Sequence, residues 1–205
     1  MSGACSEVED GYIEGHHRRF WQASTDHRGT PGELTARSWA TPFRQPSHVA
    51  TYTLTPCCWV LAASPGRVVT LAVAEDNTER VWGKVYRIAP SQVDAVMAHL
   101  DYREKGGYTM KEVTVTVPTL AQSVVALVYT GTPASEEWVG GSETVEDIAQ
   151  VIATAHGPSG PNCVYLFNLA EAIAMIAPDE RDEHLTSLVT RVKELQLLAS
   201  ANADG

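Results

Sequence analysis

The sequence has no hydrophobic run long enough to cross a membrane. Its longest apolar stretch, residues 57–63, lies between Pro56 and Pro65, whereas a membrane-spanning helix needs about 20 apolar residues. The first ten residues carry acidic side chains and no apolar segment, so we expect no signal peptide. With 44% hydrophobic residues the composition is globular. We expect a soluble, cytosolic (cytoplasmic) protein.

Positive charge is scarce. The chain has 15 lysines and arginines against 25 aspartates and glutamates, which gives a net charge of −10. Such a chain is poorly suited to general nucleic-acid binding, because contacts with phosphates need basic side chains. The one basic cluster, residues 16–19, is followed by Phe20 and Trp21. We interpret it as part of a half-exposed strand, with RNA binding as the alternative.

Motifs for metal binding and nucleophilic catalysis are also missing. No Cys-x-x-Cys and no His-Glu-x-x-His occurs, and Cys57 and Cys58 are adjacent. We interpret the cysteines as reduced thiols of an intracellular protein. The loop at 156–162 lacks the Gly-Lys-Ser/Thr ending of a phosphate-binding loop. His156 and Cys163 could suggest a thiol nucleophile, but a cysteine that opens an apolar helix is usually a core residue.

The order of the remaining elements predicts an α+β fold. β-branched or alternating runs indicate strands at 11–21, 68–74, 81–88, 113–117 and 124–130. We expect the runs 68–74 and 81–88 to form a hairpin. Helical patterns follow from residue 144 onward, so we predict a curled or barrel-like sheet with helices packed outside it. Residues 33–64 contain three prolines and little periodicity, and we interpret them as an insertion in one domain.

Polar residues mark two of the predicted helix starts. The run from Thr144 to Asp147 resembles a capping box, and it opens a helix that should bury Val145, Ile148 and Ile152 on one face. Asn162 is a candidate N-cap for an apolar helix at 164–176. A final amphipathic helix is predicted over about 184–198.

A further helix, predicted to begin after Ser91 as N-cap, ends close to a carboxylate. The residues of its buried face recur at helical spacing: Val93, Val96, Met97 and Leu100. One more turn places Glu104 on the same face, just before Gly106 and Gly107, which favour a helix end. A carboxylate there, near the negative end of the helix dipole, is expected to have a raised pKa suited to a general base. The alternative is a frayed, solvated helix end.

Six segments resemble one known family in the same order along the chain. They are residues 20–29, 65–71, 81–83, 100–108, 157–160 and 165–170. They resemble the ChaC family of glutathione-specific γ-glutamylcyclotransferases. The resemblance implies a single γ-glutamylcyclotransferase-like domain over 1–205, built as a small mixed β-barrel with flanking helices and carrying an inserted loop at 33–64.

The resemblance also implies a reaction and its site. The substrate would be glutathione, cleaved to 5-oxoproline and Cys-Gly without metal, cofactor, nucleic acid, membrane or obligate protein partner. The family's catalytic glutamate, in Arg-Glu-Lys-Gly-Gly-Tyr, maps onto Glu104 as general acid and base. Tyr129 and Arg28 are our candidates for substrate contacts. The structural alternatives are a tyrosine hydroxyl satisfied by backbone and an arginine paired with Asp26.

The sequence departs from the family pattern in two places. It contains no Tyr-Gly-Ser-Leu, the turn expected to hold the γ-glutamyl group, and we expect the similarity to begin at Gly11. Residues 33–64 interrupt a connection that is normally short, and we expect their removal to be tolerated. Two function classes therefore stay open. One is an active cyclotransferase, and the other is a weakly active or inactive relative that binds γ-glutamyl compounds or a protein partner.

Overall fold

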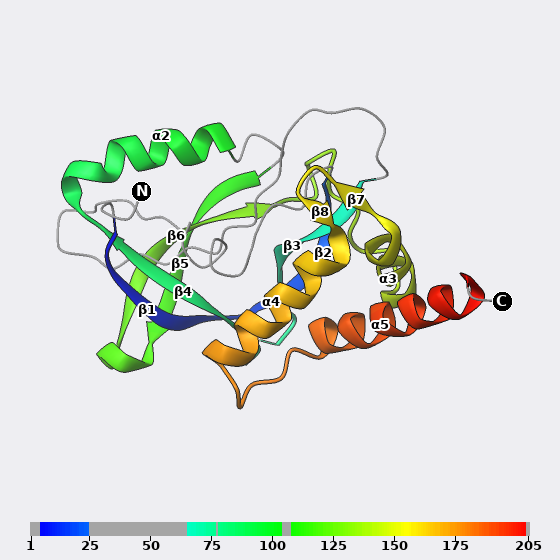
Figure 1. Ribbon diagram of the computed structural model, residues 1–205. Coiled ribbons are helices and arrows are strands. Elements are labelled where there is room, and N and C mark those ends of the chain that lie inside the picture. The colour runs from blue at the N-terminus through cyan, green and yellow to red at the C-terminus, as the bar shows by residue number, and fades with distance from the viewer. Residues whose placement is uncertain (1–4, 25–64, 77, 104–107, 204–205) are drawn as a thin grey trace.

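The structure, a computed structural model, describes residues 5–24, 65–76, 78–103 and 108–203 (Figure 1). Glu104, Arg28 and residues 33–64 lie outside the described residues. The strands are β1 (Cys5–Glu14), β2 (His16–Ser24), β3 (Gly66–Val73), β4 (Arg80–Ile88), β5 (Tyr108–Val117), β6 (Gln122–Gly131), β7 (His156–Gly157) and β8 (Gly160–Pro161). The helices are η1 (Pro90–Gln92), α2 (Val93–Arg103), η2 (Pro118–Leu120), α3 (Val145–Thr154), α4 (Asn162–Ile176) and α5 (Glu183–Ala203).

The strands form two main sheets. One has the order β4-β1-β5-β6, and the other consists of β2 and β3. Helix α2 lies at the end of the molecule with the larger sheet, whereas α3, α4 and α5 gather at the end with β2 and β3 (Figure 1). The predicted α+β class is confirmed. Among the described strands, however, no backbone ladder joins the two main sheets into the closed barrel that we expected.

A bend at Gly15 separates β1 from β2. Gly15 has φ +70°, a left-handed conformation that glycine adopts at little cost. The bend is bonded to the segment between β3 and β4, because the Gly15 N–H donates to the carbonyl of Glu79 and its own carbonyl accepts from the Ala74 N–H, both at 3.0 Å. The prediction of one strand over 11–21 is therefore wrong, since these residues belong to two strands in different sheets.

β3 and β4 do not form the hairpin that we expected. β3 pairs antiparallel with β2, and β4 pairs antiparallel with β1. β-branched runs predict that a segment is a strand but do not predict its partner. The register of β1 against β4 is instead supported by complementary side chains, since Tyr12 lies opposite Trp82 with ring centroids 4.9 Å apart.

The basic cluster at 16–19 lies on β2, where burial alternates along the strand. Arg18 is buried, and its guanidinium donates to a carboxylate oxygen of Asp182 at 2.6 Å and to the carbonyl of Trp82 at 2.8 Å. The interpretation as a partly buried strand is confirmed. The Arg18 charge is used to attach β2 to the start of α5.

The first hydrophobic core lies between α2 and the larger sheet. The predicted helix face is confirmed, since Val93, Val96 and Leu100 are buried there and Met97 packs against them. Ser91 is not an N-cap, because it lies within η1, which leads directly into α2. α2 ends at Arg103, so the expected extra turn through Glu104 lies outside the described residues.

The second core lies between β2, β3 and the three C-terminal helices. Its buried members include Phe20, Val68, Ile148, Ile152, Tyr165, Leu188 and Val192. The predicted capping box is confirmed, because Thr144 and Asp147 each accept a hydrogen bond from the other's backbone N–H. Val145, however, is exposed rather than buried. No helix in the described ranges is long and apolar enough to cross a bilayer.

Asn162 fastens α4 to β3 instead of capping the helix. α4 begins at Asn162 itself, after Pro161 at the N-cap position, so the predicted N-cap is wrong. The Asn162 side chain is fully buried. Its amide oxygen accepts from the Arg67 N–H at 2.8 Å, and its amide nitrogen donates to the Arg67 carbonyl at 3.0 Å. One side chain thus satisfies both backbone groups of a residue on β3.

Candidate functional site

The motif residues that the structure describes lie at the junction of α2 and β5. Leu100, in the last turn of α2, is fully buried. Tyr108, the first residue of β5, packs against both hydrophobic cores. The predicted base, Glu104, lies outside the described residues, but the elements before and after it are both anchored in the protein interior.

Tyr129 lies on β6, close to this junction. It is opposite Met110 in the β5–β6 register, and Met110 is only two residues along the strand from Tyr108. The Tyr129 side chain is 5% exposed and belongs to the same core as Leu100. A core tyrosine and a tyrosine at an enclosed substrate site would both be buried in this way, so its contact with substrate stays a prediction. Arg28 and its alternative partner Asp26 lie outside the described residues.

Threonine hydroxyl groups join the two main sheets beside Tyr108. Thr70 of β3 and Thr130 of β6 are both buried, and their hydroxyl oxygens are 3.3 Å apart. The Thr70 hydroxyl accepts from the Gly131 N–H at 2.9 Å, and the Thr130 hydroxyl donates to the Leu71 carbonyl at 3.2 Å. We call Thr70, Thr130 and Gly131 the threonine seam. It ends at Gly131, which lies opposite Tyr108.

The seam leaves no space for a side chain at position 131. A Cβ on Gly131 would lie 2.3 Å from the amide oxygen of Gln22 and 3.0 Å from the Thr70 hydroxyl. Gln22 and Thr70 are both fully buried. Our reading of the sequence missed this cluster. The signal for Thr70 was present, since it is a polar residue in the largely apolar strand β3, but nothing in the sequence indicates that it lies beside Gln22 and Gly131.

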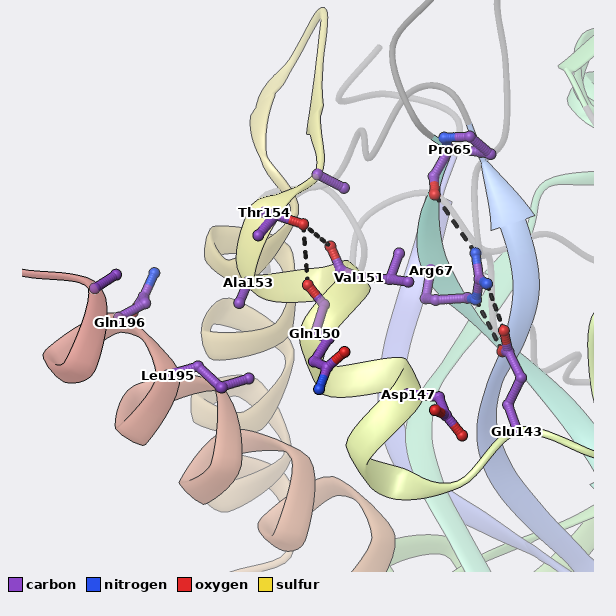
Figure 2. A pocket seen from close by; sticks show the side chains of 12 residues that line it. Pro65, Arg67, Glu143, Asp147, Gln150, Val151, Ala153, Thr154, Leu195 and Gln196 are labelled. Atoms are coloured by element: carbon purple, nitrogen blue, oxygen red, sulfur yellow. Dashed lines mark hydrogen bonds and ion pairs between the residues drawn. The ribbon is translucent and has the colours of Figure 1, made fainter. Parts of the chain in front are cut away.

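A surface pocket lies elsewhere, among α3, α5 and the start of β3 (Figure 2). Among the residues that line it, Arg67 is the one base, and it donates two hydrogen bonds to the carboxylate of Glu143, at 2.6 and 3.0 Å. An anionic ligand would have to compete with Glu143. Neither Tyr108 nor Tyr129 lines this pocket, so we do not place the candidate site there. The described residues contain no group of three or more His, Cys, Asp or Glu suited to a metal ion.

A partly buried histidine lies beside the second core. His184, in the first turn of α5, accepts a long hydrogen bond from the Phe20 N–H, at 3.5 Å. Burial lowers the pKa of His184 to about 4, and the charges of Arg19 and His17 act in the same direction while Asp182 opposes them. The ring is therefore neutral at neutral pH.

The lowered pKa of His184 predicts that stability falls in mild acid. Histidine titrates near 6.5 in an unfolded chain, so between pH 6.5 and about 4 the unfolded chain binds a proton that the folded chain does not. The resulting stability, roughly 3 kcal/mol, is present above pH 6.5 and lost as the pH falls through about 4.

The variant His184→Gln tests this prediction. Its side chain keeps a hydrogen-bond acceptor but does not titrate, so its free energy of unfolding, measured by urea denaturation, should depend less on pH than that of the wild type. His156→Gln, at an exposed position, is the control. The prediction would be contradicted by a free energy of unfolding that depends on pH in the same way in wild type and in His184→Gln.

Comparison with known families identifies the relatives of the chain. The profile of the ChaC family, described as "ChaC-like protein", matches residues 4–36 and 60–195. The chain belongs to the ChaC family. The match includes all of β1, so our expectation that the similarity begins at Gly11 is wrong. Residues 37–59 lie outside the match.

Individual ChaC-family relatives are similar over most of the chain. The rat glutathione-specific gamma-glutamylcyclotransferase 1 is 33% identical over 94% of this chain and 72% of its own length. The glutathione-specific gamma-glutamylcyclotransferase of Saccharomyces cerevisiae is 34% identical over 89% of this chain and 86% of its length. The crystal structure of a γ-glutamylcyclotransferase specific to glutathione from yeast superposes with a TM-score of 0.70, at 29% identity, and covers 94% of this chain and 90% of that one. The chain is therefore related to γ-glutamylcyclotransferases and shares their mixed α+β fold.

Proposed function

We propose that this ChaC-family chain is a glutathione-specific γ-glutamylcyclotransferase with Glu104 as its general acid and base. The observation that carries the proposal is similarity to glutathione-specific relatives over about nine tenths of the chain. The segment at 103–108, Arg-Glu-Lys-Gly-Gly-Tyr, is retained at the junction of α2 and β5. Leu100 is fully buried at one end of that junction and Tyr108 is partly buried at the other, packed against both cores, which supports a role for the junction in an interior site.

Two finer points belong to the same proposal. We infer that the two main sheets act as one wrapped β layer, a small barrel, and the threonine seam supports this because it joins β3 to β6. We also infer a single domain in which residues 33–64 are inserted. The gap in the family match at 37–59 supports that reading.

The proposed reaction closes a five-membered ring within the substrate. The α-amino nitrogen of the γ-glutamyl group attacks the γ-carbonyl carbon, a new C–N bond forms, and the bond to the cysteine nitrogen breaks. Both reacting groups belong to one molecule, so orienting them exploits effective molarities of about 10⁵–10⁸ M and no external nucleophile is needed. Glu104 takes the proton from the amine and delivers it to the leaving nitrogen, which contributes roughly 10²–10⁴-fold. The products are 5-oxoproline and Cys-Gly.

Release of 5-oxoproline by the purified chain tests the proposal. We expect release from glutathione at a rate at least about 10-fold above that from γ-glutamyl-alanine, because a site shaped for Cys-Gly gains binding energy that the smaller substrate cannot supply. Tyr129 and Arg28 are the proposed substrate contacts. Equal rates on the two substrates would reject the specificity. Glutathione binding without release of 5-oxoproline would instead identify a catalytically impaired relative.

A further inference from the structure

The threonine seam lies beside the first residue of β5, the strand that follows the proposed base Glu104 in the sequence. Tyr108 is the first described residue after Glu104, and it lies opposite Gly131. The N–H of Gly131 donates to the Thr70 hydroxyl at 2.9 Å. We propose that Thr70 is a positioning residue for the reaction, acting through Gly131 and Tyr108 on the segment that carries Glu104. This inference rests on the proposed function.

The position of Thr70 between the two cores supports this role. β3 carries Val68 and Val69 into the core of the C-terminal helices, whereas β5 and β6 line the core under α2. The hydrogen bond from Gly131 to Thr70 therefore fixes one core against the other, beside the tyrosine that packs on both. Thr70 is fully buried, so bulk water cannot replace its hydroxyl as the acceptor for the Gly131 N–H.

The expected effect follows from how strongly catalysis depends on placement. A displacement of about 1 Å in a catalytic group can cost about 10²-fold in rate. Thr70→Val keeps the shape of the side chain but removes the acceptor of the Gly131 N–H. We expect kcat for glutathione to fall at least about 10-fold while KM changes by less than about 3-fold. Thr70→Ser, which keeps the hydroxyl, should restore most of the lost turnover.

Thr116→Val is the matched control. Thr116 lies on β5 near the end of the β5–β6 pair that is far from Gly131, and its hydroxyl is 3.4 Å from the hydroxyl of Ser123. Its loss should leave kcat within about 2-fold of wild type, in line with the small effects of surface substitutions. Comparing the pH profiles of kcat/KM separates positioning from simple loss of folded protein. A misplaced base moves the acidic limb of the profile, whereas less folded enzyme lowers the whole profile without moving it.

The outcomes separate this inference from the proposed function. Wild-type turnover in Thr70→Val, or an equal fall in Thr116→Val, would overturn the inference, as would a fall that serine does not rescue. Absence of 5-oxoproline from wild-type protein would overturn the proposed function instead. Amide hydrogen exchange at residues 108–110 then decides on the positioning role. Faster exchange in Thr70→Val than in Thr116→Val supports it, and equal exchange overturns it.

Discussion

Replacing Glu104 with glutamine is expected to abolish the release of 5-oxoproline from glutathione. The amide has nearly the same shape as the carboxylate but cannot accept the proton of the attacking amine, so the whole contribution of the general base, about 10²–10⁴-fold, is lost. Steady-state assays of the purified variant at several pH values measure this. Retention of more than about a tenth of wild-type turnover would rule out the general-base role, since it lies outside that range.

Glu112→Gln is the matched control for this substitution. Glu112 is an exposed carboxylate on β5, four residues beyond Tyr108, so its loss should leave turnover unchanged. Thermal unfolding of the Glu104→Gln variant should occur at or above the wild-type temperature, because the helical spacing predicts Glu104 on a buried face, where a carboxylate is costly. A large loss of stability would mean that Glu104 has a structural partner.

Asn162→Ala is expected to produce the largest loss of stability among the substitutions considered. It removes two hydrogen bonds and leaves the N–H and the carbonyl of Arg67 without their partner. Each unsatisfied buried group costs about 1–3 kcal/mol, so for the two groups we expect a loss of roughly 2–6 kcal/mol in the free energy of unfolding. For a chain of this length that corresponds to a fall of roughly 4–24 °C in Tm.

Gln150→Ala tests whether removal of any amide side chain has this effect. Gln150 is exposed on α3 and donates to the Glu146 carboxylate at 2.9 Å. Its loss should change the free energy of unfolding by no more than about 0.5 kcal/mol. Equal urea midpoints for Asn162→Ala and Gln150→Ala would show that the link from α4 to β3 is not important for stability.

Local patterns in the sequence predicted local structure well. The buried face of α2 follows from apolar residues at helical spacing, and the start of α3 follows from the reciprocal bonding groups of Thr144 and Asp147. In both cases the interacting residues lie within two helical turns of each other. The class of the fold was equally accessible, because β1 to β6 all precede the three C-terminal helices α3, α4 and α5 along the chain.

Long-range partners could not be predicted in the same way. Asn162 was expected to cap its own helix, but its partner Arg67 lies 95 positions away. A β-branched run shows that a segment is extended but not which strand it pairs with, so β3 and β4 were paired incorrectly. The left-handed conformation of Gly15 was not evident either, because a glycine inside a strand-like run also fits an unbroken strand.

The candidate site shows the same contrast between local features, which the sequence predicts, and long-range partners, which it does not. Glu104 is proposed as the base from a contiguous motif, since the residues that mark it are neighbours in sequence. The threonine seam is formed by residues from β3 and β6 that are about 60 positions apart. Thr70 by itself looks like an ordinary strand threonine, and only its bond to Gly131 gives it a part in the proposed site.

The bend at Gly15 has a consequence for how the protein comes apart. One continuous piece of chain places Ile13 in the core under α2 and Phe20 in the core of the C-terminal helices. β3 likewise contributes Leu71 to the first core and Val68 to the second. Neither core can lose its strands without removing residues from the other. The two cores should therefore melt together in a single cooperative transition, and weakening one of them lowers the melting temperature of both.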